Sequence, residues 1–235
     1  MGVVTTTDIV NRFRSEVDDI IRGTGANADN DVLWKCGEVD GYLNEAVNQV
    51  ATETLSLYKT FDIPYLAANG PYVRLPTGYE VLDIDVIYLV TARRLITERN
   101  AVDRIHHHND YGYYGGEEGW EIATGKPRHF TRDFKMNQIR LWPAPAPDMD
   151  DTMQITAVIG AVDMQPGMPS PFQSPKDIRL ILTWMKHLAY GKKDADTFDA
   201  DATTRYKNDF ENDAAKRKYE CQRLRRAPSS VRFSW

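Results

Sequence analysis

The chain has 235 residues, 42% of them hydrophobic and 27% charged, which is ordinary for a globular protein of one domain or of a core domain with an appendage. The net charge of −5 argues against a dedicated nucleic-acid binder, because such proteins are usually basic. No apolar run approaches the ~20 residues of a membrane span, no apolar signal core opens the chain, and two cysteines do not make a disulfide framework, so we expect a soluble product of the cytosol.

The N-terminal part predicts two helices. The first is expected over Thr7–Arg22, with Gly23 as its stop and with an apolar face formed by Ile9, Phe13, Val17 and Ile20. A Gly/Asn/Asp-rich loop follows at 23–31, and the second helix is expected over Trp34–Tyr58. Its buried stripe would consist of Val39, Leu43, Ala46, Val50, Leu57 and Phe61. Gly37 and Gly41 weaken its first turns by about 1 kcal/mol each relative to alanine, and their spacing indicates either a close helix contact or a frayed first turn.

The next segment predicts strands. Pro71–Pro76 reads as a short strand bounded by prolines, and Leu82–Val90 alternates with period two. Such alternation is typical of an antiparallel sheet with one buried face. The face expected to be buried consists of Leu82, Ile84, Val86, Tyr88 and Val90. Ala92–Asn100 is compatible with a strand followed by a short helix.

A segment without periodicity follows at 101–124. Its residues 101–120 are rich in Gly, Tyr and His, and a loop of this length in a compact domain is usually functional or mobile.

Gly125–Asp163 predicts a β-meander. A Gly-Lys-Pro turn precedes a strand at His129–Thr131, and a second strand at Gln138–Trp142 is stopped by Pro143, which offers no N–H to a neighbouring strand. A longer alternating strand is expected at Thr152–Val162.

The C-terminal part again predicts helices. A proline-rich connector, Pro166–Pro175, leads to a helix at Lys176–Tyr190 that Gly191 ends. A last helix is expected over Thr197–Arg226, with an apolar stripe formed by Phe198, Ala202, Tyr206, Phe210 and Ala214. The fold class is therefore α+β, with an N-terminal helix pair, a central antiparallel β-sheet or meander, and a C-terminal helix pair with an extended tail.

The chain would divide into five regions. These are the helix pair and first strands at 1–100, the loop at 101–124, the meander at 125–165, the C-terminal helices at 166–226, and a docking tail at 227–235.

Three constellations suggest chemistry, and each has a simpler explanation. His106, His107 and His108 could bind a metal with nearby acids, but consecutive residues do not readily converge on one ion, so we favour a solvated loop. Asp194–Asp201 lacks the glycine and the glutamate of a calcium-binding loop, and its acids suit the start of a helix. Asp83 and Asp85 could form an acid–base pair, but alternation favours their exposure to water. We therefore expect no enzyme, no cofactor, and no catalytic or metal-binding residue.

The last 42 residues carry a split charge. Residues 194–213 hold seven acids against two bases, and residues 216–235 hold seven bases against one acid. Matching of the helix dipole explains the helix itself, but not the aromatic and cationic residues beyond Pro228. Aromatic and Arg residues are frequent interface anchors, so we expect a docking tail. Its contact residues would be Arg225, Arg226, Val231, Arg232, Phe233 and Trp235.

Four short motifs, taken in order, suggest a family. They are YLNEAVNQVATE at Tyr42–Glu53, VRLPTGYEVLDIDVIYL at Val73–Leu89, GKPRHFT at Gly125–Thr131 and IRLWPAP at Ile139–Pro145. In this order and spacing the chain resembles the head-to-tail adaptor (connector) proteins of tailed bacteriophages, a group that includes tail tubular and head-completion adaptors. The resemblance covers most of Trp34–Tyr219.

The resemblance implies a structural protein of the virion, located in the neck between portal and tail and made in the host cytoplasm. It would form a homo-oligomeric ring, typically a dodecamer, that binds the portal protein and the tail tube or nozzle protein. DNA would pass through its channel without sequence-specific binding, and no membrane would be involved. We expect the tail at 227–235 to contact the portal, and the loop residues Tyr111, Tyr113, Tyr114 and Trp120 to face the tail or the channel. The alternatives are another neck or tail-completion (stopper) protein and a metal-dependent hydrolase that uses His106–His108.

Overall fold

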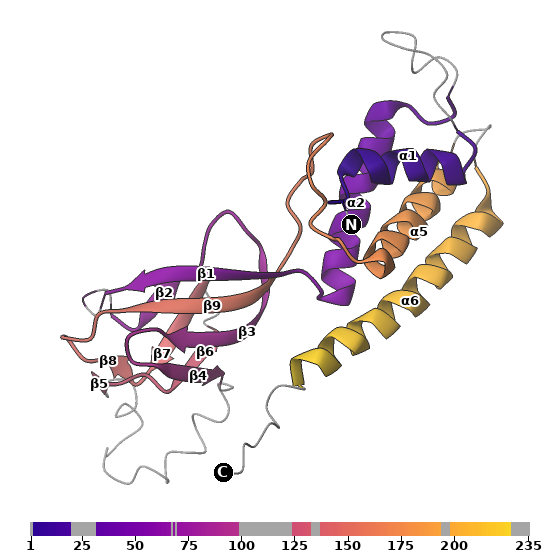
Figure 1. Cartoon of the computed structure of the whole chain (residues 1–235). Helices are drawn as coiled ribbons and strands as arrows, with labels where there is room; N and C mark the ends of the chain where they lie inside the picture. The colour runs from indigo at the N-terminus through magenta and orange to yellow at the C-terminus, as the bar shows by residue number, and fades with distance from the viewer. Residues whose placement is uncertain are drawn as a thin grey trace. The chain divides into compact units, whose positions relative to one another are not determined.

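The computed structural model describes residues 2–19, 32–66, 68, 70–98, 124–132, 137–193 and 198–226 (Figure 1). It divides into two compact units. The helical unit comprises the described residues of Met1–Leu57 and Gly160–Trp235, and the sheet unit comprises those of Tyr58–Ile159. Two helices precede the strands and two follow them in the described part of the chain, so the α+β class is confirmed.

Helix α1 spans Thr6–Glu16 and begins with a reciprocal cap. The Asp8 N–H donates to Thr5 Oγ1 at 3.2 Å, and the Thr5 N–H donates to the Asp8 carboxylate at 2.9 Å, so two N–H groups that the helix leaves open are satisfied. The predicted end at Arg22 is wrong. The helix stops at Glu16 because Asp18 adopts a left-handed conformation with φ 57°. Residues 20–23 lie outside the described part of the chain.

Helix α2 spans Cys36–Thr54 and is shorter than the predicted Trp34–Tyr58. Leu55 takes the left-handed conformation with φ 51°, and its N–H donates to the Ala51 carbonyl at 3.1 Å, which closes the helix. The chain then enters strand β1, so Phe61 lies in a strand and not on the helical stripe. The first part of that stripe is confirmed, since Val39, Leu43, Ala46 and Val50 are all buried.

Helices α5 (Pro175–Gly191) and α6 (Ala200–Arg226) match the predicted C-terminal helices closely. Asp199 caps α6, because its carboxylate accepts the Ala202 N–H at 2.9 Å. This bond confirms that an acid of the 194–201 cluster serves the start of a helix. Phe198 was expected on the buried stripe and is instead exposed, because it precedes the helix. Residues 194–197 are outside the described ranges.

The four helices share one apolar core. Trp34 lies at its centre, where its indole N–H donates to the Ala189 carbonyl at 3.2 Å and its ring meets Phe13 and Tyr190 edge-on. Helix α5 packs against α1, α2 and α6. Helix α6 runs alongside α5 in Figure 1.

A buried ion pair joins the end of α1 to the residues that precede α2. The Arg14 guanidinium lies 2.7 Å from the Asp19 carboxylate, and the side chains are 3% and 2% exposed. Arg14 also donates to the Trp34 carbonyl at 3.0 Å, and Asp19 accepts the Leu33 N–H at 2.7 Å. A buried charge is tolerated only when it is paired and hydrogen-bonded in this way.

The sheet unit holds a seven-stranded sheet in the order β1-β9-β3-β4-β6-β7-β2. A separate pair consists of β5 and β8. The strands are β1 (Tyr58–Tyr65), β2 (Tyr72–Arg74), β3 (Val81–Leu89), β4 (Arg94–Glu98), β5 (Thr124–Gly125), β6 (His129–Arg132), β7 (Gln138–Trp142), β8 (Ala144–Pro145) and β9 (Asp151–Ile159). Strand β1 was missed from the sequence because the helical stripe was extended over it.

The expectation of a purely antiparallel sheet is wrong, because the sheet is mixed. Strands β4 and β6 pair in parallel, as do β5 and β8. A parallel pair requires a connection of a dozen residues or more, and the long segment between Glu98 and His129 supplies it. The remaining neighbours in the large sheet are antiparallel.

The predicted meander is also wrong as a continuous unit. Strands β6 and β7 do pair as antiparallel neighbours, with His129 opposite Trp142. The next long strand, β9, pairs with β1 and β3 instead. The free side of β7 is taken by β2, where Tyr72 lies opposite Arg140, so β9 has no place beside it.

Two bulges in β3 change which residues are buried. Its register with β9 shifts between Val81 and Asp83 and again between Ile84 and Val86. Each extra residue exchanges the faces of the residues that follow it. Ile87 is therefore buried, with 0% exposed, whereas Val86 is 37% exposed. The predicted buried face, which included Val86 and Val90, is wrong beyond Ile84.

The buried side of the sheet forms a second apolar core. Its largest fully buried members come from four strands and include Ile87, Phe130, Leu141, Met153 and Ile155.

Asp151 holds the turn after β3 onto the start of β9. This buried carboxylate accepts the N–H groups of Thr91 at 2.7 Å, Ala92 at 2.9 Å and Thr152 at 2.7 Å. Burial alone would raise the pKa of Asp151, but the backbone hydrogen bonds outweigh it and lower the pKa below its ordinary value. The ionised form is thus favoured in the folded protein.

We expect Asp151→Asn to lower the free energy of unfolding by about 1–3 kcal/mol at pH 7, because an amide accepts these N–H groups less well than a carboxylate. Since the folded pKa is depressed, the contribution of the charge is present above the unfolded pKa of about 3.9 and is lost as the pH falls through the folded pKa. Urea titrations at pH 7 and below pH 4 should show the gap between wild type and variant closing. Asp150→Asn, at an exposed neighbour, should change stability by less than about 0.5 kcal/mol.

Candidate interaction surfaces

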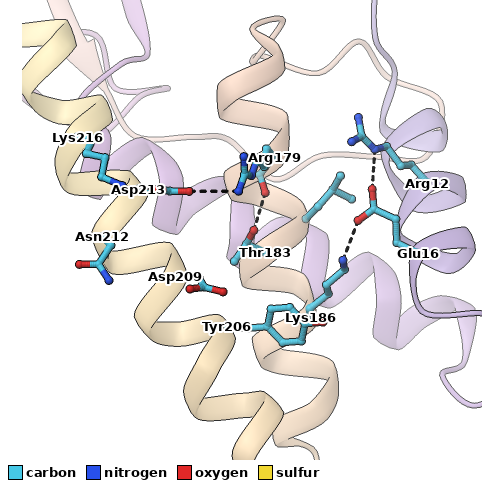
Figure 2. Close-up of a pocket in the computed structure, with 11 residues that line it drawn as sticks. Arg12, Glu16, Arg179, Thr183, Lys186, Tyr206, Asp209, Asn212, Asp213 and Lys216 are labelled. Carbon is cyan, nitrogen blue, oxygen red and sulfur yellow. Dashed lines mark hydrogen bonds and ion pairs between the residues drawn. The ribbon is translucent and has the colours of Figure 1, made fainter.

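A polar groove of about 570 Å³ lies among three helices of the helical unit (Figure 2). Helix α1 contributes Arg12 and Glu16, helix α5 contributes Arg179, Leu182, Thr183 and Lys186, and helix α6 contributes Tyr206, Asp209, Asn212, Asp213 and Lys216. Charged groups of both signs dominate this lining, so the groove differs from the mostly apolar pockets that bind small molecules.

Glu16 ties α1 to α5 at one side of the groove. Figure 2 shows its carboxylate between Arg12 and Lys186, and each cation lies 2.8 Å away. Partial burial would raise the pKa of Glu16, but hydrogen bonds from Lys186 and Arg12 outweigh it and lower the pKa. Glu16 therefore stays ionised and keeps both cations in place at neutral pH.

Asp213 has the same role at the opposite side. It lies 3.0 Å from Lys216 on its own helix and 3.7 Å from Arg179 on α5. The two cations are 74% and 76% exposed, whereas Asp213 is 37% exposed. Arg12 is likewise more exposed than its partner Glu16, at 57% against 32%. We call the exposed cations Arg12, Arg179 and Lys216 the cationic rim of the groove. Their partners Glu16 and Asp213 are less exposed, whereas Asp209, which also lines the groove, is an exposed carboxylate.

A second ion-pair cluster fixes the C-terminal part of α6. Arg217 makes two hydrogen bonds with Asp177 in the first turn of α5, at 2.7 and 2.9 Å. The hydrogen bonds to Asp177 raise the pKa of Arg217 despite its partial burial. Lys176 and Glu220 pair beside them at 2.7 Å. A bidentate Arg–carboxylate pair restricts geometry strongly, so it holds the C-terminal part of α6 against the first turn of α5.

These contacts join helices from both ends of the chain around one charged groove. A family model described as SU10 adaptor protein matches residues 4–233. The chain belongs to the SU10 adaptor protein family. This is a family of phage head-to-tail adaptors, so the resemblance seen in the sequence motifs is confirmed. No curated protein shows significant sequence similarity to the chain.

Family membership gives the adaptor a structural role in the phage virion and in tail assembly, and a role that is not enzymatic. None of the helices in the described ranges is long and apolar enough to cross a membrane.

The contact residues predicted for the adaptor are mostly outside the described residues. Helix α6 continues through Arg225 and Arg226, but their side chains are not described. The rest of the tail, with Val231, Arg232, Phe233 and Trp235, also lies outside, as do the loop residues Tyr111, Tyr113, Tyr114 and Trp120. Both assignments stay predictions.

The candidates for chemistry in the adaptor have mixed outcomes. His106–His108 lie outside the described residues, and within the described ranges no group of His, Cys, Asp or Glu is arranged to hold a metal. Asp83 was expected in water and is instead half-buried in an ion pair with Arg132. Asp85 is exposed, as expected.

The groove was not predicted from the sequence of the adaptor. The local signals were present, since Arg12 and Glu16 are spaced i,i+4 and Arg179, Thr183 and Lys186 share one polar face of α5. What the sequence did not show is that α1, α5 and α6 bring these faces together.

Proposed function

We propose that the protein is the head-to-tail adaptor that forms a ring below the portal, extends the DNA channel, helps to retain packaged DNA and docks the tail. The observation that carries this proposal is the family match over residues 4–233, which includes both the helical unit and the sheet unit. The portal protein, the tail tube or nozzle protein and further copies of the chain are its partners.

The charge of the protein suits such a channel. With a net charge of −5, its surface is not expected to bind DNA phosphates tightly. Weak binding suits a channel through which DNA must pass. The ion-paired groove and the polar faces of the helices offer contact surfaces for neighbouring protein subunits instead.

Electron microscopy of the full-length chain mixed with its portal protein tests the proposal. We expect class averages with a closed ring, typically of twelve copies, coaxial with the portal. A chain that stays monomeric beside intact portal rings would contradict the proposal, and a ring that binds only the tail protein would favour a stopper. In the same reconstruction, the loop at 101–120 should face the tail or the channel.

The tail at 227–235 supplies the portal contact in this proposal. Deletion of residues 228–235 is expected to abolish portal binding, because it removes the aromatic and cationic anchors Arg232, Phe233 and Trp235. Co-sedimentation with portal rings measures the binding, and circular dichroism checks that the helices are retained.

A matched control separates the anchors from the length of the tail. A variant with residues 228–235 replaced by eight Gly and Ser residues should also fail to bind. If either variant binds portal rings as tightly as the wild type, the tail is not the portal contact.

A further inference from the structure

Two faces of the helical unit carry opposite charge. One is the cationic rim of the groove, formed by Arg12, Arg179 and Lys216, whose side chains are more than half exposed. The other is the outer face of α2. Helix α2 contains four acidic residues and no lysine or arginine between Cys36 and Thr54. Glu38 is ion-paired with Lys192 at 3.0 Å and Asp40 is half-buried, so the exposed charge of this face comes from Glu45 and Glu53.

The outer face of α2 is turned away from the groove. Helix α2 lines no part of the groove, and its buried residues Val39, Leu43 and Val50 belong to the core shared with α5. The residues on the other side of the helix are exposed, and they form what we call the acidic face: Gly37, Gly41, Glu45, Thr52 and Glu53. Glu45 has no ion-pair or hydrogen-bond partner among the described residues of the protein.

Two positions of the acidic face, Gly37 and Gly41, carry no side chain. A Cβ atom added at Gly37 or at Gly41 would meet nothing within 4 Å. An exposed glycine inside a helix costs about 1 kcal/mol relative to alanine, and a helix that needed only solubility would gain from alanine here. Glycine is favoured where another backbone approaches closely. The glycines thus suit a helix that a neighbouring molecule covers.

We propose that the acidic face of α2 in one copy docks against the cationic rim of the next copy around the ring. This inference rests on the proposed ring function. Each copy then presents two different, complementary faces on one rigid helical core, which is the arrangement that a closed head-to-tail ring requires. Opposite charges on the two faces select the correct neighbour and the correct register.

Charge reversal on the full-length chain, assembled with portal rings, tests the pairing. Glu45→Lys and Arg179→Glu should each raise the concentration needed for half-maximal ring assembly by about 10-fold or more, because each places like charges across the interface. The double variant Glu45→Lys/Arg179→Glu should recover most of the loss, because it restores opposite charges. Mass photometry reports the ring population, and circular dichroism confirms folding of each variant.

The control is Glu211→Lys, which makes the same charge change at an exposed position on α6 outside the groove. It should assemble as the wild type does. Rings that form normally with both single reversals, or single losses that the double variant does not recover, would overturn the pairing and leave the adaptor function intact. A wild-type chain that forms no ring with its portal would overturn both.

Discussion

Asp19→Asn is expected to lower the free energy of unfolding by about 3–5 kcal/mol, because it leaves the buried Arg14 guanidinium without a counter-charge. Asp19 also accepts the N–H groups of Leu33 and Trp34. The asparagine side chain has one acceptor oxygen in place of two, so it can keep only some of these hydrogen bonds. Urea titration followed by far-ultraviolet circular dichroism measures the loss, since α1 and α2 are both tied to this pair.

The exposed pair of Arg12 and Glu16 on the same helix is the matched control. Its ions are also close, at 2.8 Å, but both are in contact with water, so Arg12→Ala should cost at most about 1 kcal/mol. A double variant, Arg14→Met/Asp19→Leu, removes both buried charges and should be more stable than Asp19→Asn. If Asp19→Asn and Arg12→Ala cost the same, the pair at Arg14 is not buried as described.

Ile87→Ala is expected to destabilise the sheet unit by about 2–5 kcal/mol, the usual cost of removing a large aliphatic side chain from a core. Ile87 is fully buried and lies opposite Ile155 on β9 and Ile96 on β4. Little space can be recovered by movement of neighbours in three paired strands. Thermal and urea unfolding would both report the change.

Val86→Ala is the companion experiment, and it should cost less than about 0.5 kcal/mol, because Val86 faces outward. The comparison tests the second bulge of β3 directly. In a strand without bulges, Val86 would share the buried face with Ile84, and the order of the two effects would be reversed. A larger loss for Val86→Ala would therefore show that the described register is wrong.

Sequence periodicity predicted the helices well but placed the C-terminal ends of α1 and α2 poorly. Ile9, Phe13, Val39 and Leu43 are buried as their spacing indicated, because a helix that packs on one side must keep its apolar residues on that side. The ends of α1 and α2 depend on Asp18 and Leu55 in left-handed conformations. Neither is a glycine, so no local signal marked the stop.

Several strands were predictable from the sequence, but β1 was missed and the partners of the strands were not predicted. The bounds of β7 agree with the expectation residue for residue, since Pro143 marks its end. The order of the sheet depends on contacts between distant segments, such as β1 with β9, that no local pattern encodes. A bulge adds one residue without any change in composition, so the exchange of faces at Val86 was also invisible.

For the candidate surfaces, too, local charge could be predicted from the sequence, whereas contacts between distant segments could not. The charge of α2 and the split charge of the last helix can be counted in the sequence, because they need no neighbour. The cationic rim combines Arg12 with Arg179 and Lys216, more than 160 positions later in the chain. Only the fold places them around one groove.

The helical unit is assembled from the two ends of the chain, with the sheet unit inserted between them. During synthesis, α1 and α2 therefore leave the ribosome long before α5 and α6 exist. At a translation rate of about 5–20 residues per second, the apolar faces around Phe13 and Leu43 stay without their α5 and α6 partners for on the order of ten seconds. The strands between them can pair during this time. The four carboxylates of α2 keep such a nascent helix charged throughout that interval, which opposes premature aggregation between chains on one polysome.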